Sequence, residues 1–284
     1  MLSYQHAYNA GGTADLHKHV VLVTLLAPLA GTGLTYVESH AGRGLYDLAA
    51  PEAEKTGEAA AGLGRLAAAL PDGPPDGPFW NVLLALRDRE GPEAYPGSPA
   101  VAATLLEPGD RLSLYERHPA EYRALGDAQG RLDARGRGRR GPRVWAAERD
   151  GHAGVRALRG APGPLLALID PSYEVKDEYG EAARTALAAF SGAGRTVVVW
   201  YPLLPAGLHA ELVTPVVEIA GPASPGVPWR GCLRSEVGFV VPPARGMTGS
   251  GLLILGPPPG AAEAMAAALA PLAPICRPTL GPGA

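Results

Sequence analysis

Residues 165–174, LLALIDPSYE, constrain the fold of this chain more than any other stretch. Five apolar residues run without a break, and so short a run bounded by proline and glycine predicts a strand buried on both faces. Strands of this kind lie inside parallel α/β sheets, where ligands bind just beyond the carboxyl ends of the strands. Asp170 is the first polar residue after the run, so we expect its carboxylate at the rim of a ligand crevice.

The turn after this strand has the chemistry to hold a planar ring that bears an amino group. Pro171 fixes its own φ angle and has no N–H, so the chain leaves the strand in a set direction. The Asp170 carboxylate and the carbonyl of the turn can accept the amino hydrogens, while the Tyr173 ring stacks on the face. An ordinary exit from a strand with a capping aspartate fits these residues as well, and both interpretations stay open on this turn alone.

Composition excludes several classes of protein. The chain has 284 residues, 46% of them hydrophobic, so we expect one α/β domain over residues 1–284. A net charge of −3 gives no global signal for nucleic acid. No apolar run approaches the ~20 residues that cross a bilayer, and the start of the chain has no signal core. Cys232 and Cys276 lack metal or redox spacing, so we expect a soluble cytoplasmic protein with no metal site and no membrane partner.

Strands with polar ends recur along the chain as in a nucleotide-binding sheet. A glycine-rich turn, SHAGRG at residues 39–44, follows the first strand and lets a ligand approach the backbone closely. Glu116 ends the second strand, where a carboxylate can accept hydrogen bonds from both ribose hydroxyls. Asp150 follows the third strand and can hold the amino group of a cofactor adenine. We predict strands at residues 34–37, 112–116, 144–147, 165–169 and 196–201, and near residues 236–241 and 252–255.

The strand–helix rhythm lapses between residues 47 and 110, where we expect a small helical insertion. Ser98 followed by Pro99 predicts a helix start with Ser98 as N-cap. His17 and His19 are two residues apart, so they point to different faces of a helix, and we expect solvated side chains there. We predict helices at residues 14–29, 56–70, 79–87, 98–106, 119–125, 152–159, 177–190 and 260–269.

Residues 131–143 hold six arginines spaced by glycines. Such a basic segment can follow a phosphate backbone, with each arginine as a counter-charge. A solvated surface loop is an equal alternative.

A series of short motifs occurs here in the order in which one family carries them. They are MLSYxHxxxAGxxAD, KH at residues 18–19, SHAGxG, YPGSP, ExHP, DG at residues 150–151, IDPxYE and RGMTxSG. Residues 170–173 also resemble the D-P-P-Y motif of methyltransferases that act on exocyclic amines, with Ser172 in place of the second proline. Together the motifs closely resemble the bacterial 23S ribosomal RNA adenine-N6 methyltransferase J family, over residues 1 to about 258.

The resemblance implies an α/β, class I S-adenosylmethionine-dependent methyltransferase: a Rossmann-like, mostly parallel sheet with a small helical insertion. It implies N6-methylation of one adenine in 23S ribosomal RNA before the subunit is complete. Glu38 and Ser39 depart from the family, which tends to have Asp-Thr. The cofactor residues that the resemblance implies are Lys18, His19, His40, Ser98, Glu116, Asp150, Gly151 and Asp170. Catalysis is implied for Asp170, with Pro171 and Tyr173 in the amine clamp, and contact with substrate RNA for Tyr4 and Tyr173.

Other functions remain open at this point. An N6-adenine DNA methyltransferase would use the same clamp, and a nicotinamide-dependent oxidoreductase shares the glycine turn and the acidic strand end. A ribosome-assembly factor could bind RNA through the arginine segment without catalysis. We expect a monomer that binds 23S ribosomal RNA, free or in assembly intermediates.

Overall fold

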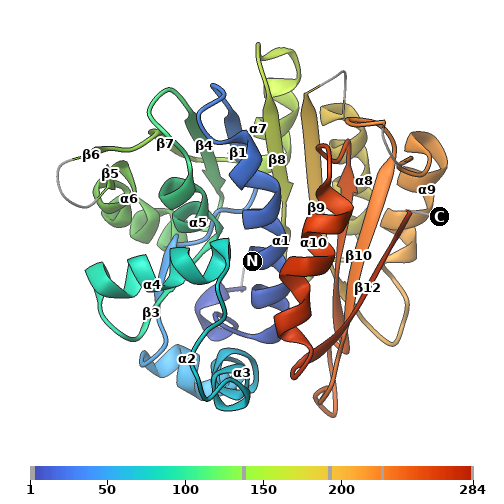
Figure 1. Cartoon of the computed structure of the whole chain (residues 1–284). Coiled ribbons are helices and arrows are strands. Elements are labelled where there is room, and N and C mark those ends of the chain that lie inside the picture. The colour runs from blue at the N-terminus through green and yellow to red at the C-terminus, as the bar shows by residue number, and fades with distance from the viewer. Residues whose placement is uncertain (1–3, 136–138, 191–193, 225–226, 283–284) are drawn as a thin grey trace.

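An eight-stranded sheet forms the centre of the molecule in a computed structural model that describes residues 4–135, 139–190, 194–224 and 227–282 (Figure 1). Its strand order is β7-β4-β1-β8-β9-β11-β10-β12. The first five strands run parallel, and the last three alternate in direction. The strands are β1 (Thr35–Glu38), β4 (Arg111–Glu116), β7 (Arg143–Glu148), β8 (Leu165–Ile169), β9 (Arg195–Leu203), β10 (Cys232–Phe239), β11 (Gly249–Leu255) and β12 (Cys276–Pro282).

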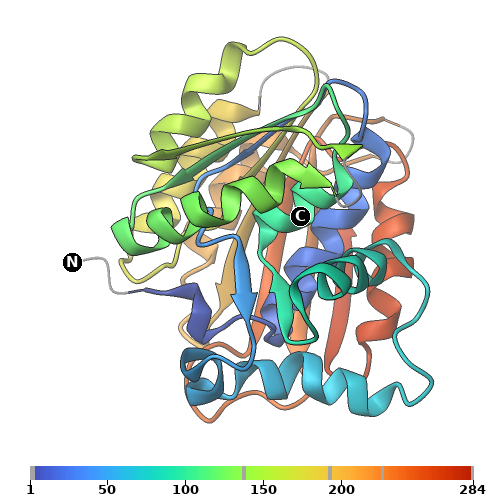
Figure 2. The same cartoon turned by 90° about the vertical axis from the view of Figure 1, so that its left-hand side faces the viewer.

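Helices cover both faces of this sheet (Figure 2). Successive residues of a strand point to opposite faces, so Leu166 and Leu168 of β8 pack on one side and Leu165, Ala167 and Ile169 on the other. This explains why the run is apolar without a break. One face carries α1 (Thr13–Leu26), α5 (Ser98–Leu105), α6 (Pro119–Asp133) and α10 (Ala261–Leu269); the other carries α7 (Gly151–Ala157), α8 (Asp177–Ala189) and α9 (Ala210–Ala220). The doubly wound sheet confirms the predicted Rossmann-like α/β class.

The strand order reverses between β1 and β8. From β1 the chain adds β4 and β7 on one side, and from β8 it adds β9 on the other. Open parallel sheets bind ligands at such a switch point, outside the carboxyl ends of the strands. Glu38 ends β1 and Asp170 follows β8, so both lie at this position.

Between β1 and β4 the chain builds small elements outside the sheet. They are β2 (Leu45–Asp47), α2 (Pro51–Thr56), a π-helical turn (Ala60–Gly64), α3 (Arg65–Ala69), α4 (Pro78–Glu90) and β3 (Ala94–Pro96), which pairs with β2. The predicted helix over residues 56–70 is confirmed from residue 58 to residue 69, with a π-helical turn in its middle. Gly57, at φ +70°, separates it from α2, which was not predicted. That residues from about 47 to 110 form a separate helical insertion subdomain stays a prediction.

The start of α1 is buried, which corrects the expectation of solvated histidines. His17 and His19 are fully buried, and Lys18 is 5% exposed. Because α1 lies between α5 and α10 and packs on the sheet (Figure 1), most side chains of its first turns are buried, and Asp15, Lys18 and His19 face a cavity instead of the outer surface.

The edge strand β12 was missing from the predictions. Its prolines cannot donate hydrogen bonds to a ladder, and most of its side chains are exposed, so the segment resembles a loop. An edge position tolerates both features, and among the described strands β12 pairs only with β10. None of the helices in the described ranges is long and apolar enough to cross a membrane.

Candidate functional site

A cavity of about 740 Å³ opens at the carboxyl ends of the parallel strands. Its walls come from the loops after β1, β4, β7 and β8, from the start of α1 and from the segment that precedes α1. All the site residues proposed from the sequence line it: Tyr4, Lys18, His19, His40, Ser98, Glu116, Asp150, Gly151, Asp170, Pro171 and Tyr173. The fold therefore brings them together from distant parts of the chain.

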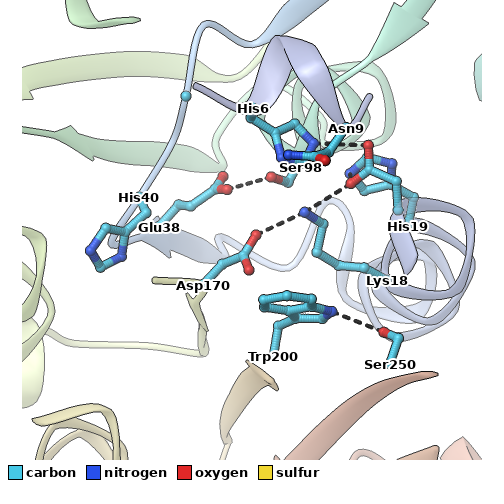
Figure 3. Close-up of polar contacts among 12 residues, drawn as sticks. His6, Asn9, Lys18, His19, Glu38, His40, Ser98, Asp170, Trp200 and Ser250 are labelled. Atoms are coloured by element: carbon cyan, nitrogen blue, oxygen red, sulfur yellow. Dashed lines mark hydrogen bonds and ion pairs between the residues drawn. The ribbon is translucent and has the colours of Figure 1, made fainter. Parts of the chain in front are cut away.

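Lys18 and Asp170, which both line the cavity, form an ion pair (Figure 3). Lys18 Nζ lies 2.8 Å from Asp170 Oδ2 and 3.0 Å from Asp15 Oδ1. Burial by itself would lower the pKa of Lys18, but the two carboxylates outweigh it and raise that pKa well above its usual range. Lys18 thus stays charged, and it leaves Asp170 Oδ1 without a hydrogen-bond partner among the described residues.

Asp15 ties the segment before α1 to this pair. Its Oδ2 lies 2.9 Å from His6 Nε2 and accepts from the Gly11 amide at 3.2 Å. Burial would raise the pKa of Asp15, yet His6 and Lys18 hold it well below its usual range. His6 Nδ1 in turn lies 2.9 Å from the Tyr4 hydroxyl, which places Tyr4 at the mouth of the cavity, 37% exposed.

His17 and His19 have different surroundings although both are buried. His17 lies between Ser250 Oγ and Ser235 Oγ, at 3.0 Å from each, and does not line the cavity. His19 Nδ1 lies 3.1 Å from Tyr95 Oη, while its Nε2 is buried 3.9 Å from Asp15 Oδ1 and has no hydrogen-bond partner among the described residues. Burial lowers the pKa of His19 to about 3, so its ring is neutral. An unpaired buried nitrogen is costly, so Nε2 is a ready contact for a polar ligand group.

The loops after β4 and β7 form the far end of the cavity. Both Glu116 oxygens accept backbone amides, from Gly42 at 2.8 Å and from His118 at 2.7 Å, which fixes the carboxylate. Asp150 is the N-cap of α7 and accepts from the Ala153 amide at 2.9 Å. The carboxylates that were predicted at these two strand ends are therefore held in place by the backbone.

Gly151 allows α7 to approach the loop after β1. A Cβ at this position would lie 1.8 Å from the Ser39 carbonyl oxygen, which only a glycine avoids. The adjacent His40 Nδ1 lies 2.8 Å from Ser39 Oγ, and its ring meets that of His152 edge-on at 5.2 Å. Burial, with His152 as a smaller cause, lowers the pKa of His40 to about 3.

Tyr173 adopts a left-handed backbone conformation, with φ +55°. Its hydroxyl donates to the Trp200 carbonyl at 2.6 Å, and its ring lies 4.3 Å from that of Tyr179. Such a backbone conformation is uncommon outside glycine and persists only where its surroundings hold it. The turn thus fixes the ring although Ser172 replaces the motif proline.

Four residues of this region were not singled out as site residues from the sequence: His6, Asp15, Glu38 and Trp200. Trp200 lines the cavity, and its Nε1 donates to Ser250 Oγ at 2.9 Å. From the sequence, Trp200 was predicted only to lie in a buried strand. Glu38 was noted only as a departure from the family, and His6 and Asp15 entered only as fixed positions of the first motif, MLSYxHxxxAGxxAD.

Ser98 does not cap α5, which corrects another prediction. Gly97 is the N-cap and Ser98 the first helical residue, and no side chain caps this end. Its hydroxyl is instead hydrogen-bonded to Glu38 Oε1 (Figure 3).

The arginine segment at residues 131–143 is only partly described, because residues 136–138 lie outside the described ranges. Arg131 at its start pairs with Glu90 at 3.1 Å. In the described parts of the chain, no cluster of histidine, cysteine and acidic residues could hold a metal.

Comparisons with known proteins agree with this geometry. Residues 31–282 match the family described as "Ribosomal RNA large subunit methyltransferase D, RlmJ". The chain is 34% identical over 266 residues to Ribosomal RNA large subunit methyltransferase J of Haemophilus influenzae and 31% identical over 268 residues to that of Escherichia coli; each match covers 91% of this chain and 88% of the relative. A crystal structure of a Legionella pneumophila protein superposes with a TM-score of 0.76 at 28% identity, over 97% of this chain and 98% of that one. The chain therefore belongs to the ribosomal RNA large subunit methyltransferase J family.

Proposed function

We propose that this protein transfers a methyl group from S-adenosylmethionine to N6 of one adenine in 23S ribosomal RNA. The observation that carries the proposal is the position of the Asp170–Tyr173 turn, an amine clamp at the switch point of the sheet, in one cavity with Glu116, Asp150 and His19. Two relatives that bear the name of a ribosomal RNA large subunit methyltransferase support the substrate class.

The cavity offers a contact for each part of the cofactor. In the proposal Glu116 accepts from the ribose, Asp150 from the adenine amine, and the Gly151 backbone and His40 line the region between them. Lys18, Ser98 and the unpaired His19 Nε2 suit the amino-acid end, because a carboxylate needs cations and donors. When bound, S-adenosylmethionine supplies an electrophilic methyl group on its sulfonium.

The clamp prepares the acceptor amine. The lone pair of adenine N6 is delocalised into the ring, so the amine is a poor nucleophile. Asp170 Oδ1 and the Pro171 carbonyl accept its two hydrogens, which favours an electron-rich, pyramidal nitrogen, while Lys18 fixes the other Asp170 oxygen. Tyr173 stacks on the base, a contact worth ~1–3 kcal/mol. Asp170 or solvent takes the proton afterwards.

The substrate must reach this clamp as an unstacked base. Tyr4 at the cavity mouth is exposed and placed to touch the RNA next to the target. The arginine segment at residues 131–143 is proposed to contact phosphates outside the cavity. We propose that the protein acts as a monomer in the cytoplasm on 23S ribosomal RNA, free or in assembly intermediates.

Calorimetric titration with S-adenosylmethionine, followed by incubation with unmodified, protein-free 23S ribosomal RNA and mass spectrometry, tests the proposal. We expect binding and a single N6-methyladenine. Transfer to matched DNA but not to RNA would indicate a DNA methyltransferase, which the clamp by itself does not exclude. RNA binding without affinity for S-adenosylmethionine would overturn the enzyme assignment in favour of an assembly factor.

A further inference from the structure

Glu38 is a fully buried carboxyl directly behind the cavity wall. It ends β1 at the switch point and does not itself line the cavity, whereas its partner Ser98 does. Oε2 accepts from the Tyr36 hydroxyl at 2.8 Å. Oε1 is hydrogen-bonded to the Ser98 hydroxyl, as Figure 3 shows. Both carboxyl oxygens are therefore held by hydroxyl groups, and Ser98 separates Glu38 from the ligand space.

The surroundings of Glu38 disfavour its charged form. Four groups face it: Tyr36 from its own strand, Ser98 from α5, Lys18 from α1 and Asp170 from the end of β8. Burial raises the pKa of Glu38 to about 8, the two hydroxyls and Lys18 oppose this rise, and the Asp170 carboxylate adds to it. A carboxyl in such a place carries its proton near neutral pH.

The proton on Glu38 decides what Ser98 can offer to a ligand. A serine hydroxyl has one hydrogen to donate. If Glu38 is ionised, Ser98 must give that hydrogen to Oε1, and only its lone pairs face the cavity. If Glu38 is protonated, it can donate to Ser98 Oγ, and the Ser98 hydrogen is free to point into the cavity. The hydroxyl hydrogen that protonated Glu38 frees can donate to an anionic group, whereas the lone pairs that face the cavity when Glu38 is ionised repel one.

We propose that Glu38 is a positioning residue whose protonated carboxyl turns the Ser98 hydroxyl toward the carboxylate of the cofactor. This inference rests on the proposed function, because it assumes that the amino-acid end of S-adenosylmethionine lies against Ser98. It predicts that affinity for the cofactor falls when Glu38 loses its proton, and that a neutral isostere removes this dependence.

Calorimetry with S-adenosylhomocysteine, which keeps the amino-acid end and withstands alkaline buffer, tests the inference. We expect wild-type affinity to fall about tenfold more than that of Glu38→Gln between about pH 6.5 and about pH 9, the size of one hydrogen bond to a charged group. The glutamine amide donates to Ser98 at every pH, while its oxygen still accepts from Tyr36. Titration of the ligand amine is common to both proteins and cancels in the comparison, and Lys18 stays charged throughout this range because its pKa is raised well above its usual value.

Two controls separate this effect from a change in the fold. Ser98→Ala should bind S-adenosylhomocysteine weakly at both pH values, and its affinity should fall no more between them than that of Glu38→Gln. 5′-Methylthioadenosine, which lacks the amino-acid end, should bind all three proteins alike at both pH values. An infrared band of a protonated carboxyl, present in wild type near neutral pH and absent from Glu38→Gln, reads the protonation directly.

The outcomes distinguish the inference from the proposed function. Equal pH dependence in wild type and Glu38→Gln would overturn the role of Glu38, as would a wild-type spectrum without the carboxyl band. Failure of the wild-type protein to bind S-adenosylhomocysteine at any pH would overturn the proposed function itself.

Discussion

Lys18 Nζ lies 2.8 Å from Asp170 Oδ2 and so joins α1 to the end of β8, 152 residues later, where we propose the amine clamp. Both groups are largely shielded from water, and Asp15 supplies a second carboxylate to the same ammonium. A buried charge needs such partners, because desolvation costs several kcal/mol per ion. The pair therefore fixes the orientation of Asp170 and leaves Oδ1 for the acceptor amine that we propose.

Replacement of Asp170 separates chemistry from folding. Asp170→Ala should lower methyl transfer by roughly 100-fold to 10,000-fold, since the amine loses its acceptor. Lys18 keeps Asp15 as a partner, so we expect the variant to fold. Single-turnover assays and a thermal melt check both statements. Asp177→Ala, a substitution of an aspartate that also lines the cavity but begins α8, is the matched control. Turnover at the wild-type rate in Asp170→Ala would refute the role of Asp170.

Trp200 should act on the RNA rather than on the cofactor. Its indole N–H is engaged by Ser250 and its ring lies 5.9 Å from that of Tyr173, so it offers the acceptor region an apolar wall. Trp200→Ala should raise the KM for RNA by about tenfold or more, because an aromatic contact with a base contributes ~1–3 kcal/mol. Trp200→Phe should recover most of this loss. A calorimetric Kd for S-adenosylmethionine that changes as much as the KM would contradict the assignment.

Gly151→Ala should damage the junction between the loops after β1 and β7. The added Cβ would meet the Ser39 carbonyl oxygen, so either α7 or the loop after β1 must move. We expect a loss of about 1–3 kcal/mol in the free energy of unfolding, as for other overpacked sites, and weaker binding of S-adenosylmethionine.

Gly126→Ala is the control for this substitution. Gly126 lies within α6, and its Cβ would meet nothing within 4 Å. Alanine in a helix interior is favoured over glycine by roughly 0.5–1 kcal/mol, so this variant should be as stable as wild type or more stable. Equal denaturation midpoints for Gly151→Ala and wild type would show that the close approach is not needed.

The buried His17 should make stability depend on pH. Its folded pKa is lowered by burial to about 3, from 6.5 in the unfolded chain. As pH falls below 6.5, His17 binds a proton in the unfolded state but stays neutral in the folded state. The free energy of unfolding then drops by about 1.4 kcal/mol per pH unit from this residue, until about pH 3.

Urea unfolding at several pH values measures this slope. His17→Gln can still hydrogen-bond to Ser235 and Ser250 but does not titrate, so its stability should fall less steeply below pH 6.5. The same slope in both proteins would mean that His17 is not the proton-linked group.

The sequence by itself determined the features that depend on local pattern. The apolar run at residues 165–169 predicts a doubly covered strand, because only a buried central strand lacks alternation. Asp170 was placed at the end of this run, and Glu116 and Asp150 at the ends of two further strands from the strand–helix rhythm; parallel strands bring their carboxyl ends to one edge. Since the motifs also point to one family, the Rossmann-like class and the cavity residues could be predicted before the fold was known.

Only the tertiary structure decided which side chains share a buried environment. Local signals placed His17 and His19 in solvent and gave Ser98 a capping role. The packed fold instead buries the start of α1 and sets Ser98 against Glu38, 60 residues away. Contacts between distant segments also bring Trp200 to the cavity wall and pair β12 with β10. Charge pairing and burial depend on contacts between segments far apart in the chain, so a short pattern of residues does not predict them.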